Sequence, residues 1–255
     1  MGVIKSFVIS FSMYSRIPMP SFKWEEKDMK YILCFFPWVG IVIGVVMYLW
    51  HFLCDSIGIG TLCYTTIGAA IPVIITGGIH VDGFMDTMDA FHSYRPREKK
   101  LEILKDSHIG AFSVIMLALY GMVYIGFLSE IDDYIIIKNV CAGFALSRCL
   151  SGIGVVTFPA AKKEGLLFLF ANNAHRNIVK ICLYVQAVLC IGFMMRQSLF
   201  SGTIIAVAAI GSFIYYYFRC KKQLGGITGD TAGYFVLLCE ECIVMAAAVI
   251  NIFQV

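Results

Sequence analysis

Three aspartates recur at short spacing where an apolar stretch of the chain ends. They are Asp82, Asp86 and Asp89. If this stretch is helical, steps of about 100° per residue place the three carboxylates within roughly 60° of one another, on one face. At about 1.5 Å per residue they span only about 10 Å along that face. Carboxylates this close repel unless a cation lies among them, and oxygen ligands favour a hard ion such as Mg²⁺. The spacing therefore indicates a divalent-metal site, with a solvated face of a loop helix as the alternative.

Basic residues follow the aspartates directly. Arg95, Arg97, Lys99, Lys100 and Lys105 all lie within the next sixteen positions after Asp89. Carboxylates that hold a metal, beside basic residues, suit phosphoryl transfer: the metal bridges phosphate oxygens, and Lys or Arg neutralises the developing charge. For Lys99 and Lys100 we favour a solvated role or contact with lipid headgroups.

A glycine-rich loop near the end of the chain is a second candidate for phosphate binding. It runs from Gly225 to Asp230, directly before an apolar segment. Backbone N–H groups of such a turn, and the helix that follows, can bind a phosphate. The alternatives are an ordinary loop between spans, and an Asp230 favoured only by the helix dipole. Glu240 lies further along, inside the apolar segment, where a carboxylate is costly and indicates a cavity, a partner or a function.

Composition places the chain in a membrane. Hydrophobic residues make up 59% of it and charged residues only 15%, with a mean hydropathy of +0.80, whereas soluble domains average roughly 25% charged residues. The net charge of +3 is too small to indicate nucleic acid as a partner. Ten cysteines without zinc-finger spacing are best explained as reduced, small apolar residues in spans. We predict an all-α polytopic helical membrane bundle, with residues 1–255 forming one integral membrane domain in the lipid bilayer.

Apolar runs and their breaks predict about seven spans. The expected spans are Tyr31–Cys54, Ser56–Ile79, Ile109–Ser129, Tyr134–Phe158, Asn177–Met195, Leu199–Phe218 and Thr231–Val255. Two further amphipathic helices are expected at the membrane surface. One lies at the N-terminus, with Val3, Ile4, Phe7, Val8, Phe11 and Tyr14 on its apolar face, and the other covers Arg97 to Lys105. No cleavage signal is expected after the N-terminal segment.

The charged residues predict an orientation. Most Lys and Arg fall in four segments, 1–30, 95–105, 162–180 and 219–222, whereas Asp55, Glu130, Asp132 and Asp133 lie in the intervening loops. By the positive-inside rule, the N-terminus is cytosolic and the C-terminus outside. The aspartates, the Pro159–Gly165 turn and the Gly225–Asp230 loop then share the cytosolic face, where they can build one site.

Several blocks in the same order resemble the cobalamin synthase family (adenosylcobinamide-GDP ribazoletransferases). The most specific are Gly-Gly-Ile-His-Val-Asp-Gly-x-x-Asp-Thr-x-Asp from Gly77 to Asp89 and the block from Leu101 to Phe112. Ser15-Arg16-Ile17-Pro18, Phe36–Gly40 and Gly225–Gly233 resemble further blocks of the family. The resemblance runs nearly end to end.

The resemblance implies a multi-pass enzyme of a prokaryotic cell membrane. Such an enzyme joins α-ribazole, or its 5′-phosphate, to adenosylcobinamide-GDP and releases GMP, with Mg²⁺ as cofactor. The implied metal ligands are Asp82, Asp86, Asp89 and Asp106. Asp82, Lys105 and Asp106 are implied as catalytic residues, with Asp106 as metal ligand or general base. The implied phosphate or substrate contacts are Arg97, Lys105, His108, Lys162, Lys163, Thr228, Asp230 and Glu240. The oligomeric state stays open.

The chain departs from the family pattern at three points. His108 stands where the family commonly has Arg, so a phosphate contact there would depend on pH. Lys162 and Lys163 replace an Arg, which keeps the charge and loses the bidentate geometry. Ser15 replaces the usual Thr.

Two other classes of function remain as alternatives. One is a phosphotransferase that makes phospholipids from CDP-alcohols, but Asp86 occupies a position that is Ala in that motif. The other is an ion or solute transporter, which predicts polar groups at mid-membrane and an internal repeat. No repeat is visible, and only Glu240 favours transport.

Overall fold

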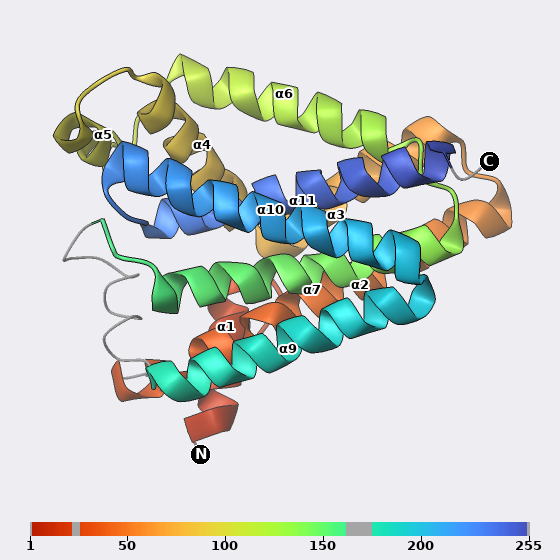
Figure 1. The fold of residues 1–255 in the computed structure, drawn as a ribbon, viewed down its shortest axis with the longest axis horizontal. Helices are drawn as coiled ribbons and strands as arrows, with labels where there is room; N and C mark the ends of the chain where they lie inside the picture. Colours follow the sequence, from red (N-terminus) through yellow and green to blue (C-terminus); the bar gives the residue numbers. More distant parts are fainter. Residues whose placement is uncertain (1, 22–25, 162–174, 254–255) are drawn as a thin grey trace.

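The computed structural model describes residues 2–21, 26–161 and 175–253, and this part of the chain is almost entirely helical. Figure 1 shows the long helices running side by side along one direction. The elements are α1 (Gly2–Tyr14), the 3₁₀ helix η1 (Glu26–Tyr31), α2 (Ile32–Ile57), α3 (Thr61–Thr76), α4 (Ile79–His92), α5 (Arg97–Ile103), α6 (Ala111–Leu128), α7 (Tyr134–Thr157), α9 (Arg176–Gln197), α10 (Leu199–Leu224) and α11 (Gly229–Phe253).

The predicted helical membrane bundle is confirmed. The helices α2, α6, α7, α9, α10 and α11 are each long and apolar enough to cross a bilayer. The helices α3 and α4 pass the same test of length and hydropathy only as a pair, and they bend by 97° at the break between them, as in a broken span or a re-entrant loop. The second predicted span, Ser56–Ile79, is therefore wrong as a single straight helix. Its helix ends because Gly77 and Gly78 both adopt a positive φ, at 64° and 82°, a conformation that glycine adopts readily.

The end of α10 also differs from its predicted position. The span expected to end at Phe218 continues as α10 to Leu224, where Gly225, with φ 74°, caps the helix. On α1, Ile4 of the predicted apolar face is 73% exposed, whereas Ser6, away from that face, is buried; the position of α1 at the membrane surface stays a prediction. The Ser6 hydroxyl donates to the carbonyl oxygen of Asp28 at 2.9 Å, so this polar side chain is satisfied where it faces η1.

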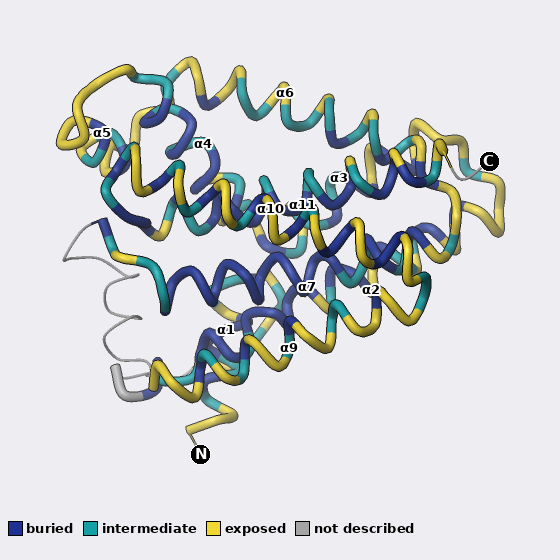
Figure 2. The backbone as a smooth tube through the Cα atoms, viewed as in Figure 1, coloured by how far each residue is buried: buried dark blue, intermediate teal, exposed yellow. Residues whose placement is uncertain are grey.

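Helix α7 forms the centre of the bundle. Figure 2 shows it buried along most of its length, with α2, α9, α10 and α11 packed around it. Gly40 and Gly44 of α2 lie so close to α7 that a Cβ on either would collide with the carbonyl oxygens of Phe144 or Cys141. Small residues at this four-residue spacing let membrane helices pack backbone against backbone.

One end of the bundle gathers the loops that the sequence singled out. The Ala161 N–H donates to the carbonyl oxygen of Ile227 at 2.8 Å, and the Ile227 N–H donates to that of Pro159 at 2.9 Å. The turn after α7 is therefore bonded to the loop before α11. Helix α5 lies at the same end, and the C-terminus lies at the other (Figure 1).

Candidate active site

A cavity of about 220 Å³ lies where the first turns of α4 and α11 meet. Ile79, His80, Asp82 and Gly83 of α4 line it, facing Gly229, Asp230, Ala232 and Gly233 of α11. Tyr14, Leu33, Phe36, Ser151 and Val155 complete its walls. A larger groove of about 560 Å³ lies on another face, but its lining holds no carboxylate. The smaller cavity is therefore the candidate active site.

Two glycines allow α4 and α11 to approach this closely. A Cβ added to Gly83 would lie 2.6 Å from the Asp230 carbonyl oxygen, and one added to Gly233 would lie 3.3 Å from His80 Cα. The aspartate helix and the glycine-rich loop thus meet at one cavity, as the sequence predicted. The first turns of both helices also carry N–H groups without a partner within the helix, which favours an anion here.

Carboxylates dominate the electrostatics of the cavity. Asp82 and Asp230 are its charged lining residues. Asp86 lies one turn beyond Asp82 and is within electrostatic range of Asp82, Asp89 and Asp230. Because like charges at this spacing repel, the site favours a cation among the carboxylates.

Asp89 has a contact that the sequence did not predict. Its carboxylate accepts from the backbone N–H of Gly110 at 2.8 Å and of Ser113 at 2.9 Å. Both N–H groups belong to the start of α6. Asp89 therefore caps α6 and ties it to the end of α4, an arrangement that the helix dipole strengthens.

Asp106 lies outside the cavity, on the exposed loop between α5 and α6. Its carboxylate accepts from the His108 backbone N–H at 3.1 Å and contacts His108 Nδ1 at 2.6 Å. These hydrogen bonds lower the pKa of the Asp106 carboxyl. Among the residues that the structure describes, no three His, Cys, Asp or Glu form a ready metal site. The four-carboxylate metal set stays a prediction.

None of the predicted basic residues that the structure describes lines the cavity. Arg97 donates to the Ala161 carbonyl oxygen at 3.5 Å, and its guanidinium touches the position that a Cβ on Gly225 would take. Lys105 and His108 are exposed. Lys162 and Lys163 lie outside the described residues. Within the described ranges, the cavity lining contains no Lys or Arg.

Thr228 and Glu240 have structural partners. The Thr228 N–H donates to Thr231 Oγ1 at 2.8 Å, and the Thr231 N–H donates to Thr228 Oγ1 at 3.2 Å. This reciprocal pair caps α11. Glu240 lies deep in the bundle, paired with Arg148 of α7 and hydrogen-bonded by Ser147. It does not line the cavity beside Asp230.

The structure adds residues that the sequence did not assign to the site. His80 is 5% exposed, and its Nε2 has no hydrogen-bond partner. Arg16 donates its backbone N–H to the Ile75 carbonyl oxygen at 2.7 Å, and its side chain packs on Gly77. The Ser15–Pro18 block therefore lies against the break between α3 and α4. The only sequence signal for this contact was that block itself.

Comparison with known proteins gives a consistent result. The sequence model described as cobalamin-5-phosphate synthase matches residues 6–248. The chain is 40% identical over 239 residues to an adenosylcobinamide-GDP ribazoletransferase of Lachnoclostridium phytofermentans, covering 93% of this chain and 90% of that protein. A protein of the same name from Clostridium perfringens (strain SM101) is 32% identical, covering 92% of this chain and 94% of that protein. One from Listeria monocytogenes is 31% identical, covering 95% of this chain and 98% of that protein. No solved structure matches the chain.

Proposed function

This chain belongs to the cobalamin-5-phosphate synthase family, and we propose that it is an adenosylcobinamide-GDP ribazoletransferase. A ribose hydroxyl of α-ribazole, or of its 5′-phosphate, attacks the phosphorus that carries the cobinamide aminopropanol. The new P–O bond forms as the bond to the GMP oxygen breaks. GMP leaves, and the hydroxyl proton passes to a base. Relatives that carry this name match over nearly their whole length.

The observation that carries the proposal is the charge pattern of the cavity. Its charged lining residues are both carboxylates, Asp82 and Asp230, yet the substrate is a diphosphate anion. Such an anion is repelled unless a cation lies between it and the carboxylates. The all-oxygen donors Asp82, Asp86 and Asp230 suit Mg²⁺, and we propose that they hold it. Bound there, Mg²⁺ would supply charge neutralisation for the reacting phosphate oxygens.

The chain's own groups then have separable roles. The first turns of α4 and α11 offer N–H groups to a phosphate oxygen, which explains how an anion can bind beside carboxylates in a cavity that no described Lys or Arg lines. Arg97 holds α5 against the Ala160–Ile227 bridge and so supports the loop before α11. The catalytic part predicted for Lys105 and Asp106 remains a proposal, since both lie on the neighbouring exposed loop.

We further propose that this end of the bundle faces the cytosol. Arg97, Lys99 and Lys221 lie at or near this end, whereas Asp55, in the last turn of α2, and Asp132, on the loop between α6 and α7, lie at the other. That asymmetry is the one expected for a membrane protein with a cytosolic N-terminus. The site would then open to nucleotide substrates at the inner surface of a prokaryotic cell membrane.

The decisive experiment measures GMP release from the purified chain in detergent, given adenosylcobinamide-GDP, α-ribazole 5′-phosphate and Mg²⁺. Chelation should abolish release, and Mg²⁺ should restore it. Asp82→Asn should lower turnover by at least about a hundredfold while Tm is kept, because a transition-state charge contact is lost. Glu130→Gln, which removes a carboxylate from a loop at the opposite end, is the matched control and should keep full activity. GMP release that survives in Asp82→Asn would remove Asp82 from the mechanism.

A further inference from the structure

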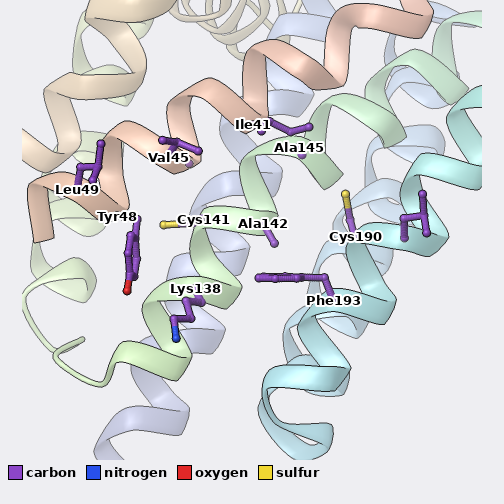
Figure 3. Close-up of a pocket in the computed structure, with 12 residues that line it drawn as sticks. Ile41, Val45, Tyr48, Leu49, Lys138, Cys141, Ala142, Ala145, Cys190 and Phe193 are labelled. Atoms are coloured by element: carbon purple, nitrogen blue, oxygen red, sulfur yellow. The ribbon is translucent and has the colours of Figure 1, made fainter. Parts of the chain in front are cut away.

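A hollow larger than the candidate active site lies elsewhere on the bundle. It is a groove of about 560 Å³ between α2, α7 and α9 (Figure 3). The groove reaches Lys138 in the second turn of α7. The candidate active site meets α7 near its other end, at Ser151 and Val155. The two hollows are therefore separate, and the proposed reaction does not explain the groove.

Small residues form the floor of this groove. Gly44, Ala142 and Ala145 lie beneath larger side chains of α2 and α9. Gly44 packs directly on the Cys141 carbonyl oxygen, so α2 and α7 touch at the backbone and leave a channel above them. Leu49 and Leu189 on its walls are 57% and 66% exposed. An exposed apolar channel of this kind is open to the acyl chains of the surrounding bilayer.

One end of the groove is polar. In Figure 3 the Lys138 amine and the Tyr48 hydroxyl point to the same end, away from the apolar floor. No ion pair to Lys138 occurs within the described residues. A lysine inside a span is costly unless its amine reaches a polar group. The pairing of a cation and a hydroxyl above an apolar channel matches the phosphate of a phospholipid.

Acidic groups continue beyond this end. The Tyr48 ring lies 6.3 Å from that of Tyr134, and the Tyr134 hydroxyl donates to Asp55 at 2.8 Å. A headgroup that carries an amine beyond its phosphate can therefore meet Lys138 first and a carboxylate next. A headgroup whose only charge is negative would instead meet repulsion from Asp55.

We infer that this groove is a binding site for one phosphatidylethanolamine molecule. One acyl chain lies over Gly44, Ala142 and Ala145. The lipid phosphate accepts hydrogen bonds from Lys138 and Tyr48, and the ethanolamine ammonium is directed toward Asp55. The site is distinct from the proposed active site and needs no chemistry there.

Native mass spectrometry of the purified full chain tests the site. The probes are phosphatidylethanolamine, phosphatidylglycerol and phosphatidylcholine with identical acyl chains. We expect one bound phosphatidylethanolamine, held at least several-fold more tightly than phosphatidylglycerol, whose headgroup has no cation, and than phosphatidylcholine, whose quaternary ammonium has no N–H to donate to Asp55. Lys138→Met should weaken its binding roughly fivefold, since a lysine near the headgroups contributes about 1 kcal/mol, and Lys138→Arg should keep most of it. Ala142→Phe should block the groove.

A second groove supplies the matched control. It lies between α10 and α11, is lined by apolar side chains alone, and includes Ala246. Ala246→Phe adds the same bulk as Ala142→Phe and should leave the binding of phosphatidylethanolamine unchanged. Equal retention of all three lipids, or wild-type binding in Lys138→Met, would overturn the inference. A dimer that Ala142→Phe dissociates would also overturn it, because the groove would then hold a second copy of the chain. GMP release and Tm, both expected to be unchanged in Lys138→Met, show that the variant is folded.

Discussion

Replacing Glu240 with Leu should destabilise the bundle strongly. Arg148 and Glu240 are 1% and 4% exposed. The Arg148 guanidinium donates to Glu240, to the Ser147 hydroxyl and to the Phe144 carbonyl oxygen, at 2.5, 3.2 and 2.8 Å. Glu240→Leu leaves this guanidinium buried without its counter-charge. Breaking a buried pair in this way costs about 3–5 kcal/mol, a large part of the roughly 5–15 kcal/mol by which folded proteins are stable.

The loss should appear directly in thermal unfolding. For a chain of this size, 1 kcal/mol shifts Tm by about 2–4 °C, so Glu240→Leu should lower Tm by about 6–20 °C. The double variant Arg148→Met/Glu240→Leu removes both charges and keeps apolar bulk, so it should recover most of that Tm. Unfolding of the detergent-solubilised protein, followed by tryptophan fluorescence at matched concentration, measures all three chains.

A further variant, Glu240→Gln, and the double variant distinguish this role from the substrate contact that the resemblance implied for Glu240. A substrate contact would make Glu240→Gln lose GMP release at unchanged Tm, and the double variant would stay inactive. If Glu240 instead only stabilises the bundle through Arg148, the loss of GMP release in a single variant should follow its loss of folded protein. GMP release should then return in the double variant. If Glu240→Leu unfolds at the wild-type temperature, or the double variant is no more stable than Glu240→Leu, the ion-pair argument is refuted.

Two further substitutions test how α4 is held. Gly83→Ala should lower GMP release by roughly tenfold and lower stability by about 1–3 kcal/mol, because its Cβ would lie 2.6 Å from the Asp230 carbonyl oxygen. Gly121→Ala, where a Cβ meets open space, is the control. Equal activity of the two variants would show that close packing of α4 on α11 does not assemble the site. Asp89→Ala should lower the free energy of unfolding by about 0.5–2 kcal/mol, because the α6 cap is lost. If GMP release is retained at a temperature where the variant is folded, Asp89 acts as a cap. If GMP release is lost completely at unchanged Tm, Asp89 is the metal ligand that the sequence predicted.

The sequence predicted the helices well because a membrane span is recognised from a local run of apolar residues. Each of the six long apolar helices follows from an apolar run of sufficient length with few charged residues. It also brought Asp82 and Asp230 to one end of the bundle, because the distribution of basic residues orders the loops. Helix ends that depend on the backbone conformation of one or two residues were harder to predict from the sequence. Gly77 and Gly78 are compatible with a continuing helix in sequence, and only their positive φ angles reveal the break.

Contacts between distant residues account for what the sequence did not predict. Asp89 shares a face with Asp82 and Asp86, and its role as a metal ligand stays a prediction; the structure adds that its carboxylate caps α6 at Gly110. Glu240 looked like a neighbour of Asp230 because both belong to α11, but ten residues of helix separate them by about 15 Å. Its partner Arg148 is 92 positions away in the chain, and no local pattern indicates that pairing.

The bend between α3 and α4 explains why charged residues occur both at the end of the bundle and in its interior. His80 lines the candidate active site and also a small internal space of about 30 Å³ beside Arg148 and Glu240. The His80 side chain therefore lies between the Arg148–Glu240 pair and the candidate active site. A straight helix through Gly77 would carry the aspartates along the bundle axis, whereas the 97° bend directs α4 across the start of α11. The Arg148–Glu240 pair joins α7 to α11 directly behind that crossing, so the charges buried in the bundle fix the surface on which the site is built.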